Sequence, residues 1–213
     1  MNGIIDDDFE LALRLDHEGE TEGWSSTGSW MCCRKARFLK KIDSEKEIPL
    51  HIKSSRIYLD GIPIDNCLSL LINPDQRNAW DNGHFQLEKL DSSDYPLGTD
   101  LIYWKMFLPS VVKNRDMVQL TAYKMIGNAC VIVYKQGDDS KKPESSEFIR
   151  MKTGLSYTIL RPAEDDPSYS TLISTLGNND YGGWLPNCLM GLLYSMSITN
   201  LCNRLLHAYH NQH

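Results

Sequence analysis

The sequence is poor in clustered positive charge. Its 213 residues include 22 Lys and Arg against 28 Asp and Glu, which gives a formal net charge of −6. The basic residues occur as scattered pairs such as Lys40-Lys41. A nucleic-acid partner and strong attraction to an anionic membrane both require a concentrated basic surface. We therefore expect no nucleic-acid partner, and no membrane docking that depends on charge alone.

The sequence also lacks a long apolar run and a paired-cysteine motif. No segment has the roughly 20 apolar residues that a membrane-spanning helix needs, and Asp6-Asp7-Asp8 stands where a secretory signal has a basic flank. The six cysteines form no C-x-x-C pair, and the adjacent Cys32-Cys33 cannot readily bond to each other. We expect reduced thiols in a cytoplasmic monomer whose residues 1–213 form a single domain.

Motifs that mark enzymes are missing as well. The sequence has no G-x-S-x-G elbow, G-x-G-x-x-G turn, Walker loop or H-E-x-x-H pair. His207, His210 and His213 recur every three residues at the C-terminus, a pattern better explained by a fraying helix end than by a metal site. We expect no catalytic residue, no metal ligand and no cofactor, so that the protein is not an enzyme.

Strand patterns dominate what is present. Apolar residues at helical spacing predict a short helix over Asp8–Leu15, and a Gly/Ser/Thr-rich stretch, Glu18–Ser29, is expected to end it. A further helix is expected at Ile64–Leu71, and Asn73-Pro74 is expected to start another that runs through Gln76–Asp81. About nine strands in sequence-adjacent hairpins predict an α+β fold with an antiparallel sheet. The expected strands are Met31–Lys40, Leu50–Leu59, Phe85–Leu90, Thr99–Met106, Met117–Lys124, Ala129–Lys135, Phe148–Lys152, Leu155–Leu160 and Tyr169–Leu176.

The most informative segment lies near the end of the chain. Asp180-Tyr181-Gly182-Gly183-Trp184-Leu185-Pro186 runs directly into the apolar segment Asn187–Tyr209, which predicts the longest helix. Two glycines permit a sharp turn at positive φ, and proline suits the first position of a helix because its missing N–H costs nothing there. A strand-rich chain is thus predicted to end in a helix.

Five ordered motifs together resemble the START domain, a lipid-carrying module. The resemblance runs from about Ile48 to His210, and its motifs are Asp75–Asp81, Leu101–Trp104, Asn114–Asp116, Phe148–Arg150 and the Gly-Gly-Trp turn. It implies a helix-grip fold, in which a curved nine-stranded antiparallel sheet surrounds a lipid tunnel closed by the C-terminal helix. Arg115, Asp116 and Arg150 match widespread positions of the family, and we expect them to orient strand ends through ion pairs.

Arg77 and Asp81 are the first candidate ligand residues. They stand four apart and so share one face of a helix. One interpretation is a surface ion pair of little energetic value. The other turns them into a tunnel, where a lipid phosphate would pair with the guanidinium bidentately. The resemblance favours the second, because Arg77 matches the phosphate-contacting arginine of phosphatidylcholine-carrying members and Asp81 matches the acidic residue beside it.

Trp104 is the next candidate. It lies on an apolar strand face and is equally explained as ordinary core. In phosphatidylcholine-carrying members, to which this chain is most similar within the family, the matching tryptophan is one wall of an aromatic cage around choline. The two tyrosines of that cage correspond here to Met117 and Gly154. Gln119 shares the strand face of Met117 and offers hydrogen bonds to another headgroup, unless the alternate set Val118, Leu120 and Ala122 lines the tunnel.

Two apolar loops are the candidates for a gate that touches the membrane. Both interrupt regular structure with side chains that are unfavourable in water, although the same residues are also explained as core packing. Trp184 matches a membrane-contacting tryptophan of the family's ceramide carrier. The expected gate residues are Phe107, Leu108, Val111, Val112, Trp184 and Leu185.

These observations predict a lipid-binding and lipid-transfer protein. It is expected to carry one phospholipid-like molecule in its tunnel and to contact membranes peripherally and transiently. Three alternatives stay open: a helix-grip hydrolase or cyclase acting on an apolar substrate, a lipid-sensing scaffold, and a carrier of sterol or ceramide instead of phospholipid. Fold alone does not decide between them, because one scaffold carries many functions.

Overall fold

A computed structural model describes residues 3–30, 36–81, 83–108, 112–183 and 187–211, without the side chains of 20, 27–30, 36, 187–197 and 199. The helices are α1 (Asp6–His17), α2 (Ile64–Ile72), α3 (Pro74–Asp81) and α4 (Asn187–His210). The strands are β1 (Ser25–Trp30), β2 (Ala36–Ile42), β3 (Leu50–Leu59), β4 (Phe85–Leu90), β5 (Thr99–Met106), β6 (Arg115–Ile126), β7 (Ala129–Gln136), β8 (Ile149–Arg150), β9 (Lys152–Thr153), β10 (Ser156–Pro162), β11 (Thr171–Gly177) and β12 (Asn179–Asp180).

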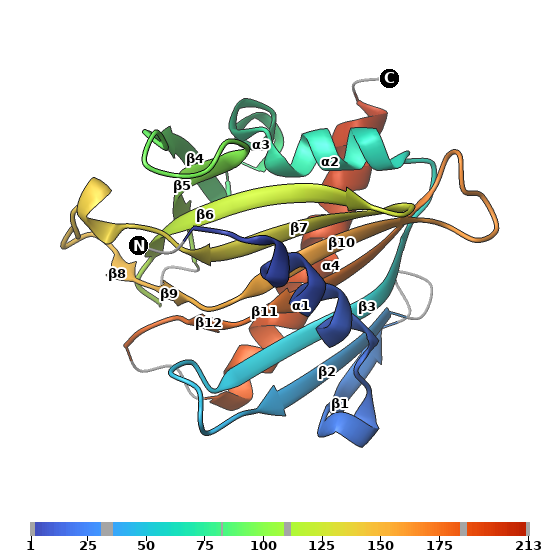
Figure 1. The fold of residues 1–213 in the computed structure, drawn as a ribbon, viewed down its shortest axis with the longest axis horizontal. Helices are drawn as coiled ribbons and strands as arrows, with labels where there is room; N and C mark the ends of the chain where they lie inside the picture. Colours follow the sequence, from blue (N-terminus) through green and yellow to red (C-terminus); the bar gives the residue numbers. More distant parts are fainter. Residues whose placement is uncertain (1–2, 31–35, 82, 109–111, 184–186, 212–213) are drawn as a thin grey trace.

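One curved antiparallel sheet organises the described part of the chain (Figure 1). Its strands follow in the order β1-β2-β3-β11-β10-β7-β6-β5-β4, while β8 pairs with β6 and β9 pairs with β12. Helix α1 crosses one face of the sheet, and α4 runs behind the opposite face (Figure 1). We call these two surfaces the α1 face and the α4 face. The expected helix-grip arrangement, with a sheet of about nine strands and a C-terminal helix against it, is confirmed.

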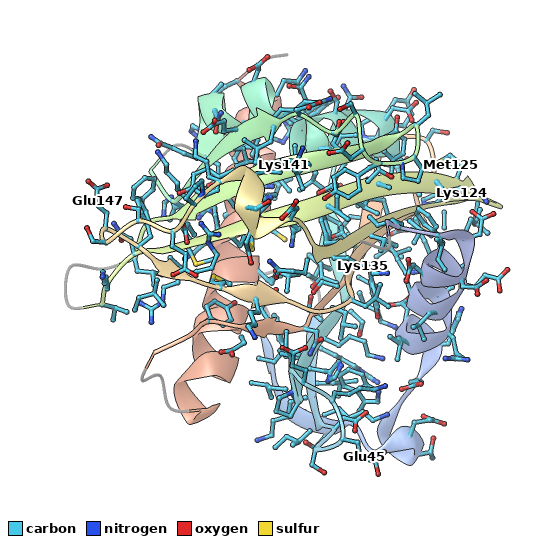
Figure 2. All side chains as sticks on the ribbon, turned by 60° about the vertical axis from the view of Figure 1, so that its left-hand side comes forward. Glu45, Lys124, Met125, Lys135, Lys141 and Glu147 are labelled. Carbon is cyan, nitrogen blue, oxygen red and sulfur yellow. The ribbon has the colours of Figure 1, made fainter. Side chains whose placement is uncertain are left out.

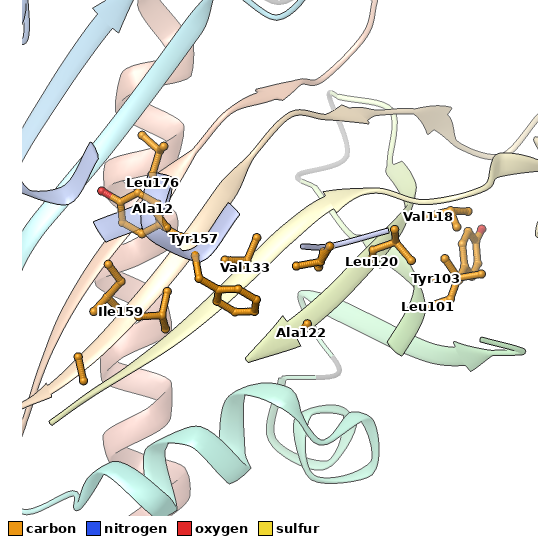
Figure 3. Close-up of a cluster of buried hydrophobic side chains, with 14 of the residues drawn as sticks. Ala12, Leu101, Tyr103, Val118, Leu120, Ala122, Val133, Tyr157, Ile159 and Leu176 are labelled. Carbon is orange, nitrogen blue, oxygen red and sulfur yellow. The ribbon is translucent and has the colours of Figure 1, made fainter. Parts of the chain in front are cut away.

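Alternating side chains build a separate core on each face. On the α1 face, alternate residues of β5, β6, β7 and β10 pack under Phe9 and Ala12 of α1. Figure 3 shows this cluster, including Leu101, Val118, Leu120 and Tyr157. On the α4 face, the alternate residues pack against α2 and the C-terminal half of α4, and this cluster includes Ile57, Cys130, Ile132, Leu160, Ile173, Leu70 and Leu205. Because strands buried on both faces show weak sequence alternation, neither face could be assigned from the sequence.

Local signals explain where α1 begins, and a contact from the distant strand β3 holds its other end. Three aspartates in its first turn stabilise the helix, because their negative charges lie at the positive end of the helix dipole. The Asp8 carboxylate also accepts a hydrogen bond from the Ile5 N–H at 2.9 Å. At its other end, Nζ of Lys53 on β3 donates to the backbone oxygens of Leu15 and Glu18. A buried lysine thus caps the helix and attaches it to the α1 face.

Two sequence predictions were wrong. The stretch Glu18–Ser29, expected to be irregular, contains most of β1, which pairs with β2 through an irregular register at Ser26/Gly28. An edge strand of polar and small residues lacks alternation, so only its pairing with β2 reveals it. The single strand expected at Phe148–Lys152 is two short strands, because β8 pairs with β6 whereas β9 pairs with β12. The expected strand start at 31–35 lies outside the described residues.

Candidate functional site

Helix α3 is positioned by hydrogen bonds at its start and along its length. The Asn73 side-chain oxygen accepts from the backbone N–H groups of Asp75 (3.0 Å) and Gln76 (3.2 Å), which caps the helix. Along the helix, the Asn78 side chain donates to the Leu87 carbonyl at 2.8 Å and accepts from the Leu87 N–H at 2.7 Å. The amide of Asn78 therefore attaches α3 to β4 and fixes the orientation of its other side chains.

Arg77 and Asp81 form a buried pair on α3. Arg77 is 5% exposed and Asp81 0%. Nε and Nη2 of Arg77 both lie 2.8 Å from Oδ2 of Asp81. Burial lowers the pKa of the Arg77 guanidinium from its usual value, and the adjacent carboxylate counteracts this. The pair is therefore not an exposed surface ion pair, because both charges have lost nearly all contact with water.

Aromatic rings surround the Arg77 guanidinium. Its central carbon lies 4.6 Å from the ring centroid of Trp80 and 5.7 Å from those of Phe85 and Trp104. Phe85 and Trp104 also meet edge to face, with centroids 5.9 Å apart. Attraction between cation and ring face stabilises a charge in such an apolar setting. The structure thus brings together three of the predicted ligand residues, Arg77, Asp81 and Trp104.

Arg204 on α4 completes this cluster and was missed in the sequence. Its Nε lies 2.8 Å from Oδ1 of Asp81, although the approach is not aligned as a hydrogen bond. The side chain is 20% exposed. His84 lies at the margin, with Nδ1 4.0 Å from the same oxygen and 53% exposure. One signal was available: Arg204 is the first charged residue after Asp180, so it is a lone charge in an otherwise uncharged helical segment.

Strand register decides which β6 residues lie on the same face of the sheet as Trp104. Met117 is the cross-strand partner of Trp104, and Gln119 is the partner of Ile102. Directly opposed residues in an antiparallel pair lie on the same face. The competing set, Val118, Leu120 and Ala122, packs with α1. Met117 and Gln119 therefore lie with Trp104 on the α4 face.

The immediate partners of Met117 are weak hydrogen-bonding contacts. The Gln119 side-chain amide lies 3.9 Å from the Met117 sulfur, and the Thr153 hydroxyl lies 3.5 Å from it. The neighbouring Gly154 has no room for a larger side chain, because an added Cβ would stand 1.8 Å from Oδ1 of Asn178. A second aromatic ring at Gly154 is therefore sterically excluded in this conformation.

Two buried polar groups beside the cluster have no protein partner. They are the indole Nε1 of Trp104 and the hydroxyl of Thr121. Both residues line a small cavity of about 30 Å³ beneath α2, which Leu71, Ile102 and Tyr134 also line. A cavity of this size accommodates about one water-sized group. An unpaired buried donor is unfavourable, so the site favours an oxygen acceptor.

The proposed gate is described only in part. Phe107, Leu108 and Val112 are partly buried, whereas Val111, Trp184 and Leu185 lie outside the described residues. Arg115 joins the described ends of the two loops by donating to the backbone oxygens of Lys113, Tyr181 (3.1 Å) and Gly182 (3.4 Å).

The structural role predicted for Arg115, Asp116 and Arg150 is correct for one pair. Nε and Nη2 of Arg150 donate to the two carboxylate oxygens of Asp116 at 2.9 and 3.0 Å, and the Tyr103 hydroxyl donates to Oδ2 at 2.9 Å. This pair joins β8 to β6, as expected. Arg115 differs from the expectation of an ion pair, because the hydrogen bonds described for it run to backbone carbonyls.

A larger groove of about 680 Å³ lies elsewhere, beside α1 and the ends of the central strands. It contains none of the five predicted ligand residues, and its charged lining is balanced between four basic and four acidic side chains: Arg14, Lys41, Lys46 and Lys152 with Glu18, Asp43, Glu47 and Asp139. The arrangement around Arg77 is more specific, because it concentrates charge and aromatic rings in a buried setting. Figure 2 shows the exposed charged side chains by contrast, such as Lys141 and Glu147.

Two further features are absent from the described residues: metal-binding clusters and membrane-spanning helices. Within them, no group of three His, Cys, Asp or Glu side chains is placed to hold a metal ion. No helix in the described part of the chain has the length and apolar character needed to cross a bilayer.

Comparison with known proteins identifies relatives of the chain. The START domain family model matches residues 70–213. The mitochondrial steroidogenic acute regulatory protein of Danio rerio is 28% identical over 96 residues, which are 45% of this chain and 33% of that protein. The human mitochondrial StAR-related lipid transfer protein 7 is 24% identical over 170 residues, 76% of this chain and 44% of that protein. The chain thus spans less than half the length of these curated relatives.

A solved structure shows the same fold. The crystal structure of human STARD10 matches with a TM-score of 0.80 at 17% identity, covering 98% of this chain and 80% of that one. At this identity the match bears on the fold alone.

Proposed function

Since the chain belongs to the START domain family, we propose that it carries one phospholipid-like molecule between the sheet and α4 and transfers it between membranes. Lipid binding and transfer are supported by membership of this family and by the similarity to StAR-related lipid transfer protein 7. We propose in addition that the cargo is a phospholipid and that the protein contacts membranes peripherally. We also propose that it acts as a monomer and is not an enzyme.

The buried guanidinium of Arg77 is the observation that carries the phospholipid assignment. It lies 5% exposed on the α4 side of the molecule, beside Trp104, with Asp81 as its ion-pair partner. A phosphate accepts parallel hydrogen bonds from such a guanidinium, and a low-dielectric setting strengthens them. A sterol or ceramide offers hydroxyl and amide groups, which match this charge less well.

The energetics of transfer fit a carrier whose selectivity lies at the headgroup. Burying roughly 30 acyl methylenes at ~0.8 kcal/mol each gives about 24 kcal/mol, but the bilayer provides nearly the same apolar environment. Extraction is therefore close to neutral, and headgroup contacts decide which lipid is retained. In the sequence, Arg77, Asp81 and Trp104 resemble positions of phosphatidylcholine-carrying members, and this resemblance favours a headgroup site there. Met117 with Gln119 would complete its wall.

The gate completes the proposal. We assign membrane contact to Phe107, Leu108, Val111, Val112, Trp184 and Leu185, and the junction made by Arg115 supports placing the two loops together. With a net charge of −6, insertion of apolar side chains would contribute more to docking than attraction to anionic lipids.

Lipid transfer between vesicles tests the proposal. Purified protein is expected to move a fluorescent phospholipid from donor to acceptor vesicles without an energy source, and native mass spectrometry is expected to show one lipid per chain. Transfer of sterol or ceramide in place of every phospholipid would reject the cargo. Turnover of a soluble substrate without any lipid transfer would favour an enzyme instead.

A further inference from the structure

The cluster around Asp81 carries one more positive than negative charge. Two guanidiniums, Arg77 and Arg204, share a single carboxylate, and each approaches a different oxygen of it at 2.8 Å. The nearby His84 is largely exposed, and its Nδ1 lies 4.0 Å from Oδ1 of Asp81. Arg77 and Asp81 are buried and Arg204 is only 20% exposed, so water screens the excess charge poorly and one negative charge from a ligand would balance the cluster.

An ammonium group would find no unpaired carboxylate among the described residues of this site. Among the described residues only two carboxylates are buried, Asp81 and Asp116. Both oxygens of Asp81 are occupied by arginines, and Asp116 is held by Arg150 and Tyr103. The sequence from 181 to 203, which covers most of α4, contains no charged residue. Asp100 lines the small cavity beside Trp104, but its side chain is 42% exposed and pairs with Lys89 at 2.6 Å. The described part of the site therefore lacks an unpaired carboxylate for choline or ethanolamine.

The aromatic rings do not replace that partner. Trp104 directs its ring toward the Arg77 guanidinium at 5.7 Å, so a second cation beside it would meet like charge. The adjacent wall consists of Met117, and Gly154 has no space for a ring. Moreover, the buried Nε1 of Trp104 needs an oxygen acceptor, which a trimethylammonium group does not contain.

From these contacts we propose that the site selects an anionic glycerophospholipid, whose headgroup carries a phosphate and hydroxyl groups but no ammonium. Its phosphate pairs with Arg77, its single negative charge balances the excess of the Arg77–Asp81–Arg204 cluster, and a headgroup oxygen accepts the Trp104 N–H. This rests on the proposed function, in which a phospholipid binds at Arg77.

Competition at equilibrium tests the headgroup class. The full chain is incubated with mixed vesicles containing equal amounts of phosphatidylglycerol, phosphatidylcholine and phosphatidylethanolamine with identical acyl chains. The bound lipid is then identified by native mass spectrometry. Occupancy is the readout, because the protein's own negative charge slows its encounter with anionic vesicles. We expect phosphatidylglycerol to exceed each zwitterionic lipid by at least about fivefold, which corresponds to roughly 1 kcal/mol.

The outcomes separate this inference from the proposed function. Equal loading of the three lipids, or preference for phosphatidylcholine, overturns the inference and leaves the phospholipid carrier intact. Failure to load any of them, with sterol or ceramide bound in parallel incubations, rejects the proposed function itself.

Variants of Arg204 test the origin of the preference. Arg204→Gln removes the excess charge and is expected to abolish the preference for phosphatidylglycerol, whereas Arg204→Lys is expected to retain it. Arg161→Gln is the matched control, because Arg161 pairs with Asp16 at 2.8 Å outside the cluster. Thermal unfolding establishes that each variant is folded. If Arg204→Gln is folded and its preference for phosphatidylglycerol is undiminished, the excess charge at Arg204 is not the origin of that preference. If Arg204→Gln does not fold, loss of the preference in Arg204→Lys contradicts the same origin.

Discussion

Nε of Arg204 on the terminal helix lies 2.8 Å from Oδ1 of Asp81 on α3, the same carboxylate whose other oxygen pairs with Arg77. The helix that covers the α4 face is therefore tied to the proposed headgroup site by an ion pair. Moving this part of α4 away from the sheet would separate the pair and leave a buried carboxylate with one partner fewer.

Replacing Arg77 tests the phosphate contact. Arg77→Leu keeps apolar volume but cannot pair with phosphate, so phospholipid binding is expected to weaken by about 2–4 kcal/mol. Arg77→Lys is expected to lose less, because it retains charge without the bidentate geometry. Equilibrium lipid loading measures both, with the exposed Arg37→Leu as control. Unchanged affinity in a folded Arg77→Leu protein would remove Arg77 from the headgroup site.

Introducing an aromatic ring beside Trp104 tests whether an aromatic cage for choline can form there. Met117→Tyr places an aromatic side chain opposite Trp104 on the α4 face, and the relative loading of phosphatidylcholine is expected to rise severalfold. Met117→Leu, which adds no ring, is expected to leave the relative loading unchanged. Competition between lipids of identical acyl chains provides the measurement. An equal shift in both variants would mean that packing, not the ring, determines the effect.

The gate is tested at Trp184, which lies outside the described residues. Trp184→Ala is expected to slow vesicle binding and transfer several-fold, while equilibrium lipid occupancy stays nearly constant, because the tryptophan acts at the membrane interface. Added salt is expected to have little effect on the rate. Transfer at the normal rate, or unfolding with loss of lipid, would show that the gate lies elsewhere.

The buried ion pair between Arg150 and Asp116 is expected to contribute strongly to stability. Their side chains are 6% and 1% exposed, so Arg150→Met leaves an uncompensated carboxylate and is expected to cost about 3–5 kcal/mol. Lys152→Met breaks the exposed contact with Glu47 and is expected to change stability by less than about 0.5 kcal/mol. Urea unfolding measures both. Similar values for the two variants would contradict the structural role of Arg150.

Alkaline unfolding has a predicted direction. Burial, together with the hydrogen bond to Asp116, raises the pKa of Tyr103 to about 12. An unfolded tyrosine loses its proton near pH 10, so the folded state binds more protons above that pH. Stability is expected to be unaffected by this group below pH 10 and to fall as pH rises from 10 to 12. Melting temperatures of Tyr103→Phe should fall less steeply over that window; an identical slope would exclude Tyr103 as a cause.

Local sequence signals were sufficient for most of the architecture. The expected bounds of β3, β4 and β5 agree with the structure, because turn residues and β-branched runs delimit them locally. The glycine–proline segment predicted where α4 begins, and the spacing of Arg77 and Asp81 predicted that they share a helix face. The resemblance contributed the tunnel and the phosphate role, which spacing alone does not contain.

Tertiary structure decided the remaining points, all of which depend on contacts between distant parts of the chain. The face occupied by Met117 and Gln119 was undetermined, because both alternating sets of β6 are mostly buried, and only the packing of α1 distinguishes them. Strand β1 was missed because an edge strand of polar residues is defined by its partner. Arg204 joined the site because α4 folds back onto α3, a contact that no local pattern expresses. Secondary structure follows from neighbouring residues, whereas the pairing of buried charges follows from which surfaces pack together.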